Sequence, residues 1–325
     1  MKKVIFALAA VVALTACSKE QTVVADRGDA IGFDSFIENS TRAIDPSYGT
    51  TNLIEEFYVW GTVKGNAMAD AMLLYNGAKV YDTTPEYGVA YGCDQSEYWL
   101  PSATYTFVAL AGHSDITPAT ETGMPATISY TADGETDLIY TTDGETVTTN
   151  PQSVPSGVNG NGCVAFTFNH LLSKVYFKFT NTSANSLCTY EISDIKIAGA
   201  KKEGTYSITD SKWTSVSGAA AALNFGTTGT TAIAQNGEAT SDFARLLLPG
   251  ENQTLTVTFK QKFYFNGQLM SETPDDQPIT KPLTATFAPN GAYVINVNLQ
   301  AGSPITFTLN KLEGWGDADP IITIK

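Results

Sequence analysis

The sequence predicts an all-β protein made of two tandem antiparallel β-sandwiches, and three observations support this fold class. First, short segments in which apolar and polar residues alternate recur along the chain, which is typical of strands with one buried face. Second, turn sequences rich in Gly, Pro, Asn and Asp separate these segments, and no helical periodicity extends beyond two turns. Third, 325 residues are enough for two domains of ordinary size. The missing alternation of strands with long helices argues against a parallel α/β fold.

Residues 1–17 are typical of a bacterial lipoprotein signal. Lys2 and Lys3 precede an apolar run over residues 4–14, which is too short to span a bilayer. Small residues then lead to Cys17, which in a lipobox receives lipid and becomes the mature N-terminus. An ordinary signal peptide with an incidental cysteine is the alternative. Acyl chains on Cys17 would tether the protein outside the cytoplasm, because each buried CH₂ contributes roughly 0.8 kcal/mol.

Composition and cysteine usage narrow the class of protein. The net charge is −14 and no basic cluster occurs, which argues against nucleic acid and anionic lipid as partners. Apolar content of 43% with only 16% charged residues predicts a folded chain. Beyond Cys17 the cysteines are Cys93, Cys163 and Cys188, an odd number that excludes a complete disulfide framework. Two alternatives remain. Either Cys163 and Cys188 form one disulfide, or all three cysteines are small buried apolar side chains.

The first half of the chain begins with a polar tether over residues 18–29. Residues 30–37 then alternate as a strand with Ile31, Phe33 and Ile37 on one face. Further strands are expected over 56–63, 71–81, 98–110, 137–142, 163–168 and 174–180.

Two kinds of turn signal interrupt this half. The dipeptide Asn76-Gly77 indicates a hairpin with a type I′ turn. Asp-Gly occurs in a near repeat at residues 131–136 and 141–146, which predicts two hairpin tips. Residues 169–173 leave room only for a single helical turn or a tight loop between two aromatic strands.

The second half repeats the same pattern of short strands and turns. Its strands are expected over 190–197, 243–248, 255–265, 283–287, 292–299, 305–309 and 321–324. The polar stretch at residues 181–185 marks the boundary between domains. We therefore expect a tether and N-terminal strand over 18–42, a first sandwich over 43–183 and a second sandwich over 184–325.

The sequence lacks the residue patterns that support catalysis or metal binding. The two histidines, His113 and His170, lie far apart, and no HExxH, CxxC, GxSxG, phosphate-loop or dinucleotide motif occurs. The preferred interpretation of His170 is a packed or hydrogen-bonded core histidine. The acidic pairs at 275–276 and 317–319 have too few ligands for a dedicated calcium loop. We therefore expect neither an enzyme nor a metal or cofactor site.

Trp99 and Trp315 are the candidates for a sugar-binding platform. Aromatic residues at strand positions more often belong to the core, but an exposed indole can stack on a sugar. Trp315 lies between Gly314 and Gly316, and we expect it to be exposed or to close the end of a domain. Exposed rings would favour the alternative function, a surface lipoprotein that binds glycans or host proteins as a monomer.

The order of several motifs resembles that of the fimbrillins, the lipoprotein precursors of type V pilus subunits in Gram-negative anaerobes. The resemblance spans nearly the whole chain, and the order of the motifs is more specific than any one of them. The segments that carry it are the lipobox at Cys17, Ile31–Ser35, Ser40–Ala43, Phe57–Gly61, Phe166–Phe177, Gly291–Asn296, Ile305–Leu309 and Gly314-Trp315.

This resemblance implies two transthyretin-like sandwich domains and export to the outer membrane as a lipoprotein. It also implies that an arginine-specific protease cuts between Arg42 and Ala43. Arg27 is the other candidate, but it precedes the first strand, so a cut there would open nothing. A cut after Arg42 would remove the first strand and leave backbone edges that template pairing with another chain. The apolar side chains removed with it would be Ile31, Phe33 and Ile37.

The implied replacement is a donor strand from residues 305–325 of the next subunit. Its apolar side chains would be Ile305, Phe307, Leu309, Ile321 and Ile324. Refilling three pockets contributes on the order of 5–9 kcal/mol. The resemblance thus implies a structural or adhesive subunit of a fimbria at the cell surface. Its partners would be other fimbrial subunits, the protease and the outer membrane, and shaft, tip and anchor roles all stay open.

Overall fold

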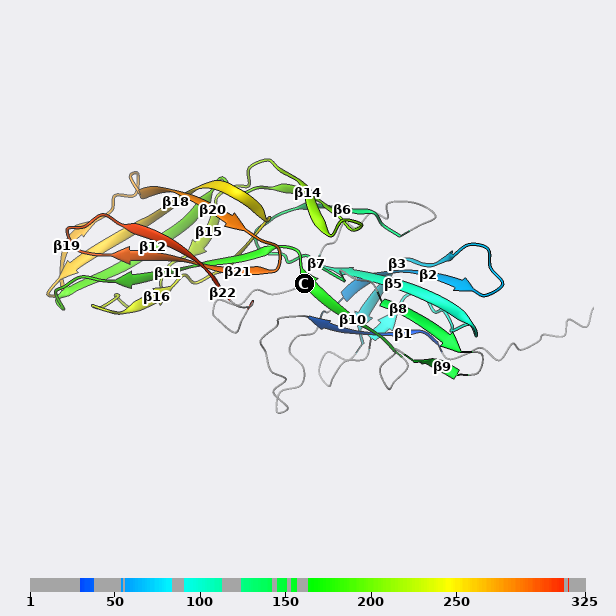
Figure 1. Cartoon of the computed structure of the whole chain (residues 1–325). Helices are drawn as coiled ribbons and strands as arrows, with labels where there is room; N and C mark the ends of the chain where they lie inside the picture. Colours follow the sequence, from blue (N-terminus) through cyan, green and yellow to red (C-terminus); the bar gives the residue numbers. More distant parts are fainter. Residues whose placement is uncertain are drawn as a thin grey trace, which may run out of the picture.

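The computed structural model describes residues 30–37, 54, 56–83, 91–112, 124–141, 145–150, 153–156, 163–312 and 315. Within these residues every regular element is a β-strand, which confirms the predicted all-β class. Figure 1 shows that most strands gather in two bodies that lie end to end. No helix in this part of the chain is long and apolar enough to cross a membrane.

The first body is one nine-stranded sheet. Its strands are β1 Gly32–Ile37, β2 Glu56–Gly65, β3 Met72–Asp82, β4 Tyr91–Cys93, β5 Ala103–Ala111, β7 Ile139–Tyr140, β8 Glu145–Asn150, β9 Ser153–Ser156 and β10 Cys163–His170. Their order is β1-β10-β7-β5-β2-β3-β4, with β8 paired to β5 and to β9. The sheet curls, since Ala30, just before β1, forms a bridge with Tyr98, which follows β4.

Aromatic rings fill the inside of this curled sheet. Phe57, Tyr75, Phe107 and Phe166 are all fully buried, and they come from β2, β3, β5 and β10. Phe57 and Phe166 meet edge to face with ring centroids 5.9 Å apart, one of the favoured geometries for aromatic pairs. The sheet therefore encloses its own core, which accounts for the alternation of apolar residues along each strand.

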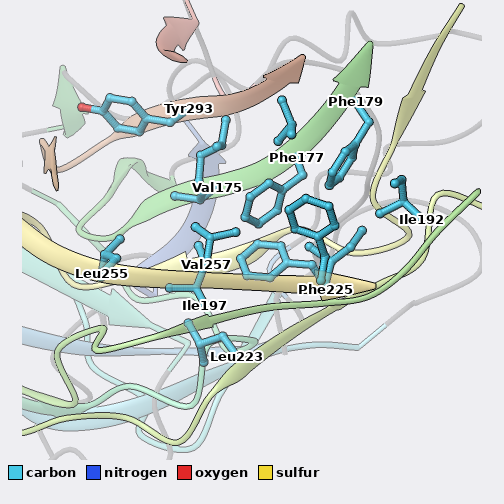
Figure 2. Packing of buried hydrophobic residues seen from close by; sticks show 14 of the residues in the cluster. Val175, Phe177, Phe179, Ile192, Ile197, Leu223, Phe225, Leu255, Val257 and Tyr293 are labelled. Carbon is cyan, nitrogen blue, oxygen red and sulfur yellow. The ribbon is translucent and has the colours of Figure 1, made fainter. Parts of the chain in front are cut away.

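The second body is a sandwich of two five-stranded sheets. Its strands are β11 Ser173–Asn181, β12 Cys188–Ala198, β15 Leu223–Gly226, β16 Glu238–Thr240, β17 Arg245–Leu247, β18 Gly250–Phe265, β19 Gln268–Glu272, β20 Ile279–Phe287, β21 Gly291–Leu299 and β22 Thr306–Leu312. One sheet has the order β16-β11-β21-β22 with β17 on β11, and the other has β15-β12-β18-β19 with β20 on β18. Figure 2 shows Phe177 and Phe179 of β11 pointing toward Phe225 of the opposite sheet. Phe177 and Phe225 meet edge to face at 4.9 Å, so the core lies between the two layers.

A third, three-stranded sheet joins the two halves of the chain. It consists of β6 Thr127–Thr131, β13 Glu203–Ser207 and β14 Lys212–Ser217, in the order β14-β13-β6. Since β6 comes from the first half and pairs with β13 of the second, backbone hydrogen bonds connect the halves. Between the sheets the chain crosses at Leu171-Leu172, a tight connection that agrees with the predicted break. The chain thus passes from the first body to the second between β10 and β11, before residue 183. The domain boundary predicted at residue 183 stays a prediction.

Buried residues from both halves pack at this crossing, and we call them the junction cluster. They are Trp60, Val108, Leu110, Ile128, Tyr130, Ala132, Leu138, Tyr140, Leu171, Leu172, Tyr206, Leu246, Leu248, Ala292 and Trp315.

The predicted hairpin at Asn76-Gly77 is wrong. Strand β3 runs through this dipeptide, and its register with β2 shifts between Val59 and Trp60. Gly77 has a φ of +71°. A residue with positive φ can form a β-bulge as well as a turn, and here it produces the bulge.

Among the described strands, two ladders are parallel and the others are antiparallel. The parallel ladders join β1 to β10 and β11 to β21. A parallel pair needs a long crossover connection, and in both cases many intervening strands provide it.

Candidate functional site

Strand β1 forms one edge of the first body. Its parallel ladder with β10 runs from Gly32 opposite Cys163 to Ile37 opposite Phe168. On its other side, the backbone N–H of Ile31 donates to the carbonyl of Glu97 at 2.9 Å. The strand is thus held between β10 and the chain that follows β4, and it completes the curled sheet.

Phe33 of β1 and Ile31, just before this strand, enter the aromatic core. Ile31 is 6% exposed and Phe33 is 4% exposed. The Phe33 ring stacks on Phe166 at 5.8 Å and meets Tyr75 edge to face at 5.4 Å. The same ring lies 6.0 Å from Phe107. Phe33 therefore contacts rings from three other strands and occupies a defined pocket.

Strand β22 forms an edge of the second body. It pairs antiparallel with β21 along its whole length. Ile305, Phe307 and Leu309 are half-buried and pack against the margin of the sandwich core. β1 and the described part of the predicted donor segment, β22, therefore both lie at the edge of a sheet, one in each body.

A buried polar group lies at the junction of the two bodies. His170 Nδ1 is 2.5 Å from Asp137 Oδ2, and both side chains are buried. Trp315 stacks on the His170 ring, with centroids 3.5 Å apart and an interplanar angle of 6°. Lys174 Nζ donates to the Trp315 carbonyl oxygen at 3.3 Å. This geometry confirms the interpretation of His170 as a packed, hydrogen-bonded histidine.

Comparison with known families identifies the fold. The sequence matches the fimbrillin-like family over residues 41–315. The chain belongs to the fimbrillin-like family. The match covers β2 to β22 and Trp315, and it begins after β1. Among curated proteins, no sequence matches this fimbrillin-like chain significantly.

Two solved structures with the same overall fold come from Bacteroides species. A candidate cell adhesion protein from Bacteroides ovatus is 19% identical, with a TM-score of 0.55 over 90% of this chain and 99% of that one. A fimbrial protein from Bacteroides vulgatus is 13% identical, with a TM-score of 0.51 over 88% of this chain and 99% of that one. At these identities the likeness concerns the fold alone.

The two tryptophans predicted for a sugar platform are buried in this fimbrillin-like protein. Trp99 is 6% exposed and meets Tyr105 edge to face at 4.7 Å. Trp315 is 8% exposed and closes the junction between the bodies. Neither indole presents a face to solvent, so a sugar platform at these positions stays a prediction that the burial does not favour.

Several predicted site residues lie outside the described part of the chain. For Ile37 the backbone is placed, but its side chain is not described. The residues outside the described ranges are Cys17, Arg27, Arg42, Ala43, His113, Ile321 and Ile324.

The described residues offer little for metal or redox chemistry. Among them, no group of three or more His, Cys, Asp or Glu side chains could hold a metal ion. Cys93, Cys163 and Cys188 are present as thiols on β4, β10 and β12. Burial raises the pKa of the Cys93 thiol, which lowers the thiolate fraction and hence its reactivity.

A polar hollow of about 590 Å³ lies over β6 and β13. Its lining consists mainly of Ser and Thr hydroxyls, together with Asp133 and Glu203. The Asp133 carboxylate already accepts hydrogen bonds from the backbone of Glu135 and from Thr136. The lining residues include no histidine that could activate a hydroxyl, so this hollow offers hydrogen bonds but no nucleophile–base pair.

Proposed function

We propose that this fimbrillin-like protein is a structural or adhesive subunit of a type V fimbria, assembled by donor-strand exchange after proteolysis removes β1. One observation carries the proposal: β1 pairs along its length with β10 alone, and Phe33, with Ile31 just before the strand, is buried in the core of the first body. Family membership supports the coarser statement of a fimbrial or adhesion subunit at the cell surface. It equally supports a structural rather than an enzymatic protein.

The groove left by β1 would combine apolar pockets with unpaired backbone groups. Refilling the pockets of Ile31 and Phe33 contributes about 3–6 kcal/mol at roughly 1.5–3 kcal/mol per side chain. The β10 backbone groups that face β1 would also lose their partners, and such an edge templates pairing with another chain. The pocket term alone approaches the stability of a small domain, so a subunit that refilled the groove would stay bound.

The donor strand is drawn from residues 305–325 of the next subunit. Ile305, Phe307 and Leu309 alternate in the same way as the apolar residues of β1. An edge strand such as β22 can leave by breaking one ladder. Ile321 and Ile324, nearer the C-terminus, are the second donor candidates.

Processing and anchoring fit the same scheme. Lipid on Cys17 would hold the precursor at the outer membrane, and an arginine-specific protease would cut between Arg42 and Ala43. The removed segment, residues 17–42, would carry both the lipid and β1. One cut would therefore release the subunit from the membrane and open its groove, whereas an anchor subunit would remain lipidated and uncut.

The test uses full-length protein treated with an arginine-specific protease. We expect a new N-terminus at Ala43 by mass spectrometry and ladders that resist SDS on electrophoresis. Arg42→Gln should stay uncut and monomeric, while Arg27→Gln, the matched control, should behave as the wild type. Ladders from Arg42→Gln, or cut protein that begins at Ala43 and stays monomeric, would contradict the proposal.

A further inference from the structure

Residues from both bodies hold Trp315, one through its indole and one through its backbone carbonyl. His170 is the last residue of β10 in the first body, and Lys174 lies in β11 of the second. The His170 ring stacks on the indole at 3.5 Å, and Lys174 Nζ donates to the Trp315 carbonyl at 3.3 Å. Trp315 is only 8% exposed. The chain that follows β22 is thus anchored at the point where the bodies meet.

The orientation of the His170 ring, on which the indole stacks, is fixed by contacts that do not involve Trp315. Asp137 Oδ2 lies 2.5 Å from His170 Nδ1, and Asp137 Oδ1 accepts the backbone N–H of Leu138 at 2.8 Å. Asp137 is fully buried. Gly112 has a φ of +87°, and a Cβ there would collide with the Asp137 carbonyl. These contacts set the position of the carboxylate and therefore the plane of the imidazole.

The anchor is incomplete, which allows it to open. The Nε1–H of Trp315 is buried and has no hydrogen-bond partner among the described residues. In solvent this donor would bond to water, so docking the indole loses that bond and weakens the docked state. The stack and the Lys174 bond hold the tail, while the unpaired donor favours its release.

Strand β22 is divided between two cores. Ile305, Phe307 and Leu309 pack on the sandwich core, whereas Leu312 packs on the junction cluster, to which Trp315 also belongs. The C-terminal end of β22 is therefore held by the junction as well as by the sandwich, where Leu312 pairs with Ala292 of β21 and also packs near Val294. Trp315 follows Leu312 by only three residues, so displacing the C-terminal end of β22 would pull on the indole stacked on His170.

The same junction is connected to β1. Strand β10 pairs with β1 as far as Phe168 opposite Ile37, and it ends two residues later at His170. The strand that loses its partner when β1 leaves is therefore the strand that presents His170 to the indole. A shift of the end of β10 would directly change the stacking on Trp315.

We propose that the Trp315–His170 stack is a latch that keeps β22 docked until β1 leaves. The inference rests on the proposed function, in which β1 is removed and the C-terminal segment is lent to another copy. The latch keeps β22 docked in its own subunit while β1 still fills the acceptor groove. It thereby suppresses premature exchange between precursors.

Amide hydrogen exchange of the full-length monomer tests the latch. In Trp315→Ala we expect the β22 amides that bond to β21 to exchange about tenfold faster or more, as for local opening. The β12–β18 ladder should keep its rate, which separates local opening from global unfolding. Trp315→Phe keeps a ring over His170 and should give a smaller increase. Trp213→Ala removes an indole that bonds to the Leu171 carbonyl at the same junction, and it should leave β22 unchanged.

The link to β1 has its own measurement. In full-length Phe33→Ala, which loosens β1 without removing it, β22 should also exchange faster, and adding Trp315→Ala should produce little further increase. Unchanged β22 exchange in Trp315→Ala overturns the latch, and unchanged β22 exchange in Phe33→Ala overturns its coupling to β1. Both results concern the monomer. A protein that shows both effects but never forms ladders would contradict donor-strand assembly and leave the latch standing.

Discussion

The two edge strands belong to their bodies in different ways. Phe33 of β1 and Ile31 just before it are buried, and Phe33 touches rings from three other strands. In β22, Phe307 and Leu309 are only half-buried on the margin of a core that already has two complete layers. Losing β1 therefore opens a core, whereas moving β22 uncovers the side of one. This difference fits the proposed roles, in which β1 is the strand that is removed and β22 is the donor strand that replaces it in the next subunit.

The largest expected effect is at Phe33. Phe33→Ala should lower the free energy of unfolding by about 3–5 kcal/mol, because it leaves a cavity among packed rings. Denaturant unfolding measures the loss. Phe265→Ala, at a phenylalanine that is 37% exposed, is the control and should change stability by less than about 1 kcal/mol. Similar losses of unfolding free energy in the two variants would mean that Phe33 of β1 does not fill a pocket in the core.

A smaller effect is expected at Phe307 in β22. Phe307→Ala removes a ring that is only half-buried, so we expect a loss of about 1–2 kcal/mol. The loss should be accompanied by faster amide exchange in β22 and by unchanged exchange in β2 and β5. If Phe307→Ala destabilised the protein as much as Phe33→Ala, the contrast between the two strands would disappear.

Gly32 tests the close approach of β1 to β10. A Cβ on Gly32 would lie 2.6 Å from Cys163 Sγ but 3.6 Å from Cys163 Cβ. Gly32→Ala should therefore cost about 1 kcal/mol, at the low end for overpacking because the thiol can rotate away. Adding Cys163→Ala should remove the clash, and a double-mutant cycle in denaturant should show the favourable coupling. Additive losses would show that the two strands do not meet at this pair.

Much of the strand pattern was predictable from the sequence because alternation follows burial directly. Val164, Phe166, Phe168 and His170 occupy one face of β10 and are all buried. The predicted strand ends at residue 168, so the pattern did not place His170 on this face, although β10 extends to it.

The partners across the sheets were not predictable in this way. Asp137 lies 33 residues from His170, next to a strand of only two residues, and Trp315 follows the last strand of the second body in the sequence. Tertiary packing brings these three side chains together, and no local spacing encodes that packing. Asn76-Gly77 shows the same limit, because its positive φ fits a bulge and a turn equally well and only the neighbouring strand decides.

The smallest effect is expected at Asp133, which lies in the connection between β6 of the third sheet and β7 of the first body. Burial raises the pKa of its carboxyl, but hydrogen bonds from the hydroxyl and backbone of Thr136 and from the backbone of Glu135 outweigh burial and lower it below its ordinary value of 3.8. A lowered folded pKa contributes stability that is complete above the unfolded pKa and is lost as the pH falls through the folded one. The contribution should stay below about 1 kcal/mol, because the carboxylate is largely exposed and screened.

Asp133→Asn should therefore flatten the acid limb of the stability curve below about pH 4, with little change at neutral pH apart from this contribution. Unfolding midpoints of the wild type and variant, measured at several pH values, give the comparison. Amide exchange in β1 and β22 should stay the same in the two proteins at neutral pH, because the turn packs on Arg245 and Leu246 rather than on either edge strand. Faster exchange in either strand would mean that the connecting turn also holds it in place, and the two edges could then no longer be treated as independent of this turn.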